Sequence, residues 1–492
     1  MRRNAPNVWK TSESKGTLAM RIISALVGLL SPAVTNYSPG AANQTIANDI
    51  ELHIADEVLR IAQRQLVAYQ FGQPLTIQKN TGVTYTATRY ERLPLPFAPL
   101  SEGVAAAGEA ITIAQVSATA QQWGDLVRVT DVADMTIKHP LFKQAIRLIA
   151  IQQPETIERN VLNILLTGTQ VNYANGRANR ASIVATDVMT PIEIGKVVGS
   201  LETFGAPSFN GDERVDMKIE ADARTKASKA PGVMPHYVSL IHPLVTQDLR
   251  QNSTIATAWS YSDLNRLYNN DLGEWGGARF CKTNMMPYWT GVATVGAGTP
   301  ATTGGALANG TYYLQVTGSP TATSVEQRIY QVATVTTVGG SGAGSISITV
   351  PTLAGYTFSV YIGTTTSPTN LALSASGPAV GPLAGQATQI ASGATIVLTG
   401  IGTAQTPPAA PATGVTVYPT LFFGMDAFGQ VLLDNVEYHY LKDADKSDPM
   451  NQTRVVSWKM MYGTIILNNA YMARVESGSA FSAGYSAGTA TE

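Results

Sequence analysis

The sequence predicts an α+β fold into which an all-β domain is inserted, and three observations lead to this prediction. The chain has 492 residues, enough for two or three domains. Its charged parts contain segments with helical periodicity of apolar residues beside segments with strand-like alternation. A long central stretch is nearly free of charge, because between residues 283 and 425 the only charged side chains are Glu326 and Arg328.

Charge and cysteine content exclude several classes of protein. Lys and Arg total 33 and Asp and Glu total 34, with a sequence pI of about 6.5, which is not the balance of a strongly basic nucleic-acid binder. Cys281 is the single cysteine, so neither a disulfide framework within the chain nor a cysteine-based zinc site is expected. Stability must come from packing, within the chain and with neighbouring subunits.

The N-terminal part is predicted to hold an apolar segment and a helix. Residues 22–30, IISALVGLL, are too short for the ~20 residues that span a bilayer. They fit either an arm that packs on a neighbour or a signal-peptide core, for which Met20 would be the natural start. Residues 43–69 carry apolar side chains at helical spacing, and the sequence FGQP at 71–74 ends this helix.

Residues 78–132 are predicted to form an extended hairpin. Both arms are strand-like and rich in Thr, Val, Tyr and Ala, and the tip between them is rich in proline and glycine. A projecting arm of this kind buries little of its own surface, so its ordering must be offset by contacts with partners.

A long helix is predicted over residues 140–166. Pro140 suits its first turn, where no amide hydrogen bond is lost, Pro154 lies inside and should kink it, and Gly168 marks its end. A second helix is expected to begin with a capping box of Thr190 and Glu193. Further expected elements are a helix end at Gly205, a buried strand at 236–242, a short helix at 243–251 and a strand at 278–282.

The uncharged stretch is predicted to be a β-sandwich inserted at 293–414, similar to immunoglobulin or fibronectin type III modules. Six strand candidates recur there, separated by turn-rich Gly, Ser, Thr and Pro sequence. The sequence PPAAP at 407–411 is interpreted as the exit linker. After it, two strands are expected on either side of an Asp/Lys turn, and the tail from Phe481 is expected to be disordered.

Short motifs spread in order over 45–290 and 416–478 carry a family resemblance. They are RYERLPL at 89–95, LSEGV at 100–104, QWGD at 122–125, HP at 242–243, DLR at 248–250, GARF at 277–280, KDADKSDP at 442–449, MYG at 461–463 and NN at 468–469. Together they resemble the coliphage N4-type major capsid proteins of tailed bacteriophages.

That resemblance implies the Hong Kong 97 (HK97)-like major capsid fold and a role as a self-assembling shell subunit, not as an enzyme. It also implies capsomers and an icosahedral head around double-stranded DNA, scaffolding and portal partners, no cofactor, and a location in the virion after assembly in the host cytoplasm. The implied parts are an N-terminal arm and helix (1–75), an extended loop (76–133), a spine helix and peripheral domain (134–189), a first axial segment (190–292), the inserted sandwich (293–414), a second axial segment (415–440), peripheral strands (441–478) and a flexible tail (479–492).

Candidate subunit contacts come from two charged clusters. Ion pairs across a subunit boundary are expected from the hairpin charges Arg89, Glu91 and Arg92. The Asp/Lys turn, with Asp443, Asp445, Lys446 and Asp448, is expected to be either a solvated turn or a charge contact between subunits. The turn could bind a divalent cation, but it lacks the spacing of a Ca²⁺ loop, so no metal site is predicted. The five histidines show no paired-ligand spacing, so core or capping roles are expected for them.

Two other functions remain as alternatives. A secreted surface-layer or adhesin protein is favoured by the low-charge sandwich and the segment at 22–30. A carbohydrate-active enzyme would need two placed carboxylates, and no pattern in the sequence picks out such a pair. Weak binding of host-surface glycans by the sandwich is compatible with the capsid role, and no membrane partner is expected.

Overall fold

The computed structural model describes residues 66–78, 82–90, 93, 108–136, 141–209, 236–255, 271–296, 298–321, 325–337, 343–378, 383–441 and 452–482. The chain forms two compact units. Unit 1 contains residues up to 164, 207–235 and 425–468, and unit 2 contains residues 165–206, 236–424 and 469 onward. The expected apolar segment at 22–30, most of the expected first helix and the tail beyond residue 482 lie outside the described residues.

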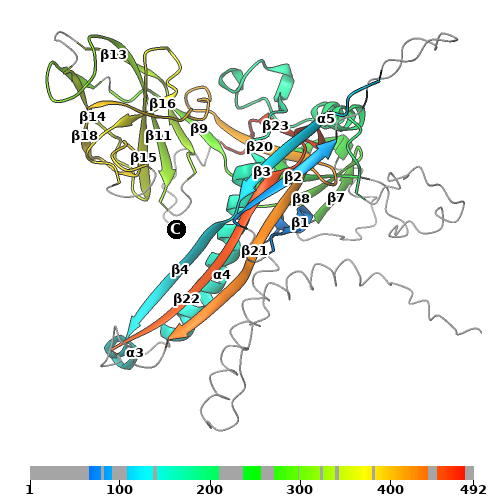
Figure 1. Ribbon diagram of the computed structural model, residues 1–492. Helices are drawn as coiled ribbons and strands as arrows, with labels where there is room; N and C mark the ends of the chain where they lie inside the picture. Colours follow the sequence, from blue (N-terminus) through cyan, green and yellow to red (C-terminus); the bar gives the residue numbers. More distant parts are fainter. Residues whose placement is uncertain are drawn as a thin grey trace, which may run out of the picture. The chain divides into compact units, whose positions relative to one another are not determined.

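Unit 1 is built on a four-stranded sheet in the order β1-β21-β22-β4 (Figure 1). The strands are β1 (Gln73–Thr76), β21 (Phe428–Leu441), β22 (Thr453–Ile466) and β4 (Gln121–Thr130). β22 runs antiparallel to both neighbours, and β1 runs parallel to β21. Strands β21 and β22 flank the expected Asp/Lys turn, as the sequence predicted.

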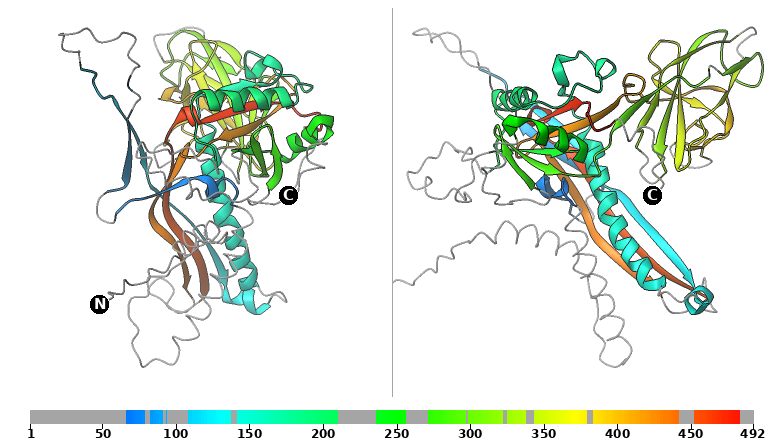
Figure 2. Two further views of the ribbon diagram at one scale, coloured as in Figure 1. Left: turned by 90° about the vertical axis from the view of Figure 1, so that its right-hand side faces the viewer. Right: turned by 180° about the vertical axis from the view of Figure 1, so that it is seen from behind.

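The helix α4 (Leu141–Leu165) lies along this sheet, as both views of Figure 2 show, and confirms the predicted long helix. Alternate residues of β22 are buried, from Val456 to Tyr462, which is the period expected when one sheet face is covered. The Tyr462 hydroxyl donates to the Ile157 carbonyl at 3.5 Å, and Tyr438 donates to Gln153 at 3.2 Å, so the covered face meets the helix.

Strands β2 (Thr84–Tyr90) and β3 (Ile113–Thr119) form the predicted hairpin arms, paired antiparallel over their whole length. The second arm continues through Ala120 into β4, which pairs with β22 instead of extending the hairpin. A short helix, α3 (Asp131–Thr136), follows β4. The hairpin is therefore rooted in the four-stranded sheet by a shared chain segment.

Unit 2 contains a sheet centred on β20 (Thr416–Phe423), all eight residues of which are buried. The neighbouring strands are β5 (Val171–Tyr173), β6 (Tyr237–Ile241), β7 (Asp271–Trp275), β8 (Ala278–Lys282), β9 (Trp289–Val292) and β23 (Met472–Ser477). Helices α5 (Pro191–Thr203) and α6 (Pro243–Gln251) pack on it through Val197, Leu201, Val245 and Leu249. The predicted elements at 236–242, 243–251 and 278–282 are confirmed.

The inserted segment forms a two-layer sandwich within unit 2. One layer contains β11 (Gly310–Pro320), β12 (Arg328–Tyr330), β13 (Ala333–Thr337), β15 (Tyr356–Gly363), β16 (Asn370–Leu373), β17 (Ile390–Ala391) and β19 (Gly400–Ala404). The other contains β10 (Thr299–Ala301), β14 (Ser345–Thr349) and β18 (Thr395–Leu398). Isoleucines of β14 and β18 meet leucine, valine and phenylalanine side chains of β11 and β15 in one core. The predicted strands are confirmed.

Two local predictions are corrected. Residues 66–68 are not helical, and only a 3-10 turn, η1 (Tyr69–Phe71), follows them. Thr190 precedes α5 but its hydroxyl donates to the Glu193 carboxylate, so it does not cap a backbone amide. β21 lies in unit 1 and β23 lies in unit 2. In the described residues, no helix is long and apolar enough to cross a membrane.

Candidate functional site

One face of the hairpin β2–β3 is exposed along its whole length. Thr84, Thr86 and Thr88 line one face, opposite Thr119, Ser117 and Gln115. That row ends in the exposed pair of Tyr90 and Ile113, which are 69% and 51% exposed. Neither of these large side chains is buried within the chain.

The opposite face of the hairpin is partly buried at its root. Tyr85, Val116 and Ala118 pack against Leu75, Ile77, Ala120, Val431 and Ile465, the small core where β1, β21 and β22 meet. Farther out, Arg89 pairs across the strands with Ala114 and is exposed. Arg89 therefore lies on the outer part of the hairpin, beyond the residues that pack on this small core.

The remaining candidate contact residues lie outside the described residues: Glu91, Arg92, Asp443, Asp445, Lys446 and Asp448. Within the described residues, no group of His, Cys, Asp or Glu could hold a metal ion. His242 caps α6 by accepting the Leu244 amide at 3.2 Å, and burial lowers its pKa to about 4, so this histidine has the predicted capping role. His236 is buried, as expected for a core role.

A buried carboxylate on α4 holds the chain just before β1. Glu158 is fully buried and accepts the backbone amides of Val67, Ala68 and Tyr69 at 3.1, 2.7 and 3.2 Å. Burial raises the pKa of Glu158 to about 7, and the three amide hydrogen bonds oppose that rise. Sequence analysis missed this site, since the glutamate shows only as one residue of a helical pattern.

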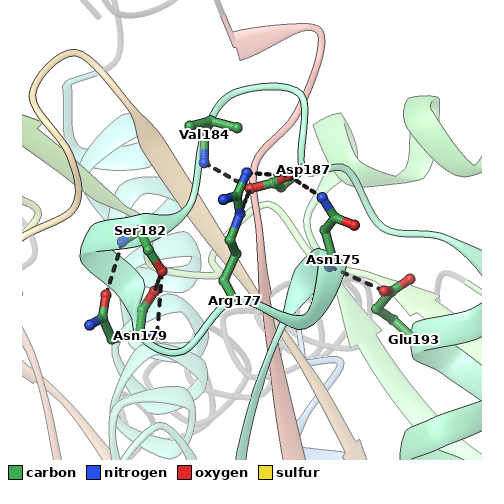
Figure 3. A network of polar contacts seen from close by, with 7 residues as sticks. All are labelled: Asn175, Arg177, Asn179, Ser182, Val184, Asp187 and Glu193. Atoms are coloured by element: carbon green, nitrogen blue, oxygen red, sulfur yellow. Dashed lines mark hydrogen bonds and ion pairs between the residues drawn. The ribbon is translucent and has the colours of Figure 1, made fainter.

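In unit 2, the loop between β5 and α5 is tied together by one aspartate (Figure 3). Asp187 accepts the Arg177 guanidinium at 2.7 Å, the Asn175 amide at 2.9 Å and the Val184 backbone at 3.0 Å. These bonds, with that of Arg177 the principal one, hold the pKa of Asp187 below its usual range against its burial. Asn175 has a φ of +56°, and its backbone amide bonds to Glu193 at 3.1 Å.

This ordered loop positions Arg180 at the base of the sandwich. The Arg180 guanidinium binds both oxygens of Glu476 at 2.6 Å and lies 3.7 Å from the centre of the Trp289 ring. It also donates to the Ala409 carbonyl at 3.0 Å. Arg474 completes the cluster, with its guanidinium 2.9 Å from Glu476.

The cluster joins the chain where it enters the sandwich to the chain where it leaves. Trp289 begins the entry strand β9, and Ala409 lies in the exit segment. The exit segment is also held by Gln331, which donates to the Pro411 carbonyl at 2.6 Å. The segment at 407–411, interpreted from sequence as a linker, is therefore held by hydrogen bonds from Arg180 and Gln331.

Three structural features agree with the fold that the family resemblance implied. A long helix on a four-stranded sheet, a projecting hairpin and a separate helix-covered sheet are the parts that the HK97-like capsid fold was expected to supply. The sequence itself matches no known family model and no curated protein.

Solved phage capsids are similar to this chain in structure. The capsid of Cyanophage P-SCSP1u matches with 12% identity and a TM-score of 0.43, over 91% of this chain and 94% of that chain. The capsid of Ralstonia phage GP4 matches with 8% identity and a TM-score of 0.44, over 91% and 96%. The acid-stable capsid of Helicobacter pylori bacteriophage KHP30 matches with 9% identity and a TM-score of 0.41, over 97% and 99%. At such low sequence identities and TM-scores, no functional residue of these capsid proteins is assigned to a residue of this chain.

Proposed function

We propose that this chain is a major capsid protein that assembles through hexameric and pentameric capsomers into a phage head around double-stranded DNA. The hairpin β2–β3 carries this proposal. It exposes Tyr90 and Ile113 at its outer end and rows of hydroxyl side chains on one face, so it gains little from folding alone.

Assembly would give this hairpin a neighbouring subunit on which its exposed apolar side chains can be buried. Burying apolar area contributes about 25 cal/mol per Å², so docking of the hairpin on a neighbour stabilises both. Many such contacts, each weak, make closure of a shell cooperative. Under this proposal the charged clusters, including Arg89, Glu91 and the turn at 443–448, pair across subunit boundaries.

Electron microscopy tests the proposal directly. The full chain would be expressed alone and together with the scaffolding and portal proteins of its phage. Closed polyhedral shells or capsomers are expected. A folded monomer under both conditions would contradict the proposal and turn attention to the secreted adhesin alternative, for which the first measurement is the N-terminus of the mature chain. Charge reversal at Glu91 in the same assay tests the proposed ion pairs, and normal particles would refute them.

The inserted sandwich is proposed to face outward. A module of this size would obstruct packaged DNA or subunit contacts elsewhere. Because the entry and exit chains are bonded to each other, removal of residues 293–414 with a short Gly-Ser link should leave particles intact. Intact and deleted particles would then be compared for retention on host cells or mucus. Reduced retention is expected if the sandwich binds glycans, and unchanged retention removes that role.

A further inference from the structure

The chain segment 472–482, here called the strap, is buried except at Ala480 and Phe481. Its first part is β23, all six residues of which are buried. β23 lies between β20, to which it is antiparallel, and β5, to which it is parallel. Within the described residues β5 pairs with no other strand, so the strap joins β5 to the sheet of unit 2.

Beyond β23 the strap is held by two aspartates. The Gly478 amide donates to the backbone carbonyl of Asp187 at 2.9 Å. The Ala480 amide donates to the Asp248 carboxylate at 3.2 Å. The approach at Gly478 is close, since an added Cβ would lie 2.8 Å from the Val184 carbonyl oxygen. A larger residue at this position would therefore displace the strap from the loop that precedes α5.

The strap holds Arg180 by two routes. The direct route is Glu476 on β23, whose two carboxylate oxygens each accept the Arg180 guanidinium at 2.6 Å. The indirect route passes through Asp187, whose backbone carbonyl bonds to the strap. The carboxylate of this aspartate binds Arg177 and Asn175, which fixes the loop that carries Arg180 (Figure 3).

Arg180 passes this attachment on to the base of the sandwich. Its guanidinium donates to the Ala409 carbonyl of the exit segment and stacks on Trp289 of the entry strand. We propose that the strap locks the mounting of the sandwich: when docked it fixes Arg180 against both segments, and when undocked it lets the base open. This lock would act within unit 2 of a single chain, whether or not the chain forms a shell.

The charges explain why undocking and opening should occur together. When Glu476 leaves with the strap, Arg180 becomes a buried cation without its carboxylate partner, which costs free energy. The guanidinium regains stabilisation by turning toward water. That movement breaks its hydrogen bond to Ala409 and its stacking on Trp289, so the entry and exit segments lose their common attachment.

Hydrogen exchange of the purified full chain tests this coupling. The Arg474 amide reports on the strap, those of Gly291 and Gly414 on the base, and that of Gly344 on the sandwich interior, since each makes a backbone hydrogen bond at 2.9 Å. In low denaturant the strap and base amides should share one free energy of opening and one denaturant slope, and Gly344 should have different values. Separate values for the strap and the base would overturn the proposal.

A substitution in the strap tests the direction of the effect. Gly478→Ala acts away from the Arg180 cluster, because its methyl group would meet the Val184 carbonyl. The amides of Arg474, Gly291 and Gly414 should then all exchange about tenfold faster or more. Faster exchange at Arg474 with a change of less than about twofold at the two base amides would refute the lock.

The matched control is Gly344→Ala, where an added Cβ would lie 2.8 Å from the Leu307 carbonyl oxygen in the sandwich interior. It should leave the two base amides unchanged, and an equal acceleration there would show that opening of the base is not specific to the strap. If Gly478→Ala does not fold, Asp248→Ala removes the acceptor of the Ala480 amide and should give the same pattern with a smaller rise. Base amides that stay unchanged while the strap loosens in Asp248→Ala would equally refute the lock.

Discussion

Arg180→Met should loosen the base of the sandwich while leaving most of the side chain's volume in place. The guanidinium is the principal partner of Glu476, which is fully buried. Removing one partner of a buried ion pair costs about 3–5 kcal/mol, since the other charge stays buried. Arg474 remains 2.9 Å from Glu476 and offsets part of this cost. The lost stacking on Trp289 adds about 1 kcal/mol.

The net loss is therefore about 3–4 kcal/mol, which corresponds to a roughly 100- to 1,000-fold increase in local opening. Exchange of the Gly291 and Gly414 amides reports it, because Gly291 bonds to Val415 and Gly414 bonds to Gly291, each at 2.9 Å. A change of less than about twofold would refute the claim that Arg180 fastens the two chain segments.

A matched pair of variants separates charge from packing. Arg177→Met removes a guanidinium from the same loop, but that side chain is 36% exposed and Asp187 keeps its other donors, so its effect on exchange should be much smaller than that of Arg180→Met. Adding Glu476→Gln to Arg180→Met should not restore the lost protection, because Arg474, which is also buried, would then lack the carboxylate that lies 2.9 Å from it.

Two further predictions concern the insert junction and the hairpin. Gly291→Ala should lower the melting temperature of the chain, since an added Cβ would lie 2.2 Å from the Ala412 carbonyl oxygen. The control Gly296→Ala should leave the melting temperature unchanged, since an added Cβ there would have no heavy atom within 4 Å. Equal shifts in the two variants would contradict the close approach at Gly291. Tyr90→Ser combined with Ile113→Ser should change the stability of the subunit by no more than about 0.5 kcal/mol and yet reduce particle yield in electron microscopy; normal yield would remove the hairpin from the proposed interface.

Local sequence patterns correctly predicted the helices and strands that depend mainly on residues close together in the chain. Helix α4 has a helical period of apolar residues over 25 positions, and α6 begins at a proline directly after His242. The sandwich strands carry their own alternation and turns, so they were predicted without knowledge of their partners.

Two of the failures have a different cause, which is contact with distant parts of the chain. Residues 66–68 have helical periodicity, but the amides of Val67 and Ala68 bond to Glu158, about 90 positions away, instead of to helix carbonyls. Thr190 has a capping sequence, but the nearby Glu193 takes its hydroxyl. The pair of Arg180 and Glu476 spans 296 positions, and no spacing rule could find it.

The way the sandwich is mounted has a mechanical consequence. β9 pairs with β12 of the sandwich on one side and with β20 of the supporting sheet on the other. A pulling force on the sandwich would therefore pass through paired strands and the Arg180 cluster. A peptide grafted into its exposed turn at 364–367 would keep a fixed orientation relative to the supporting sheet, which suits the module for ordered display.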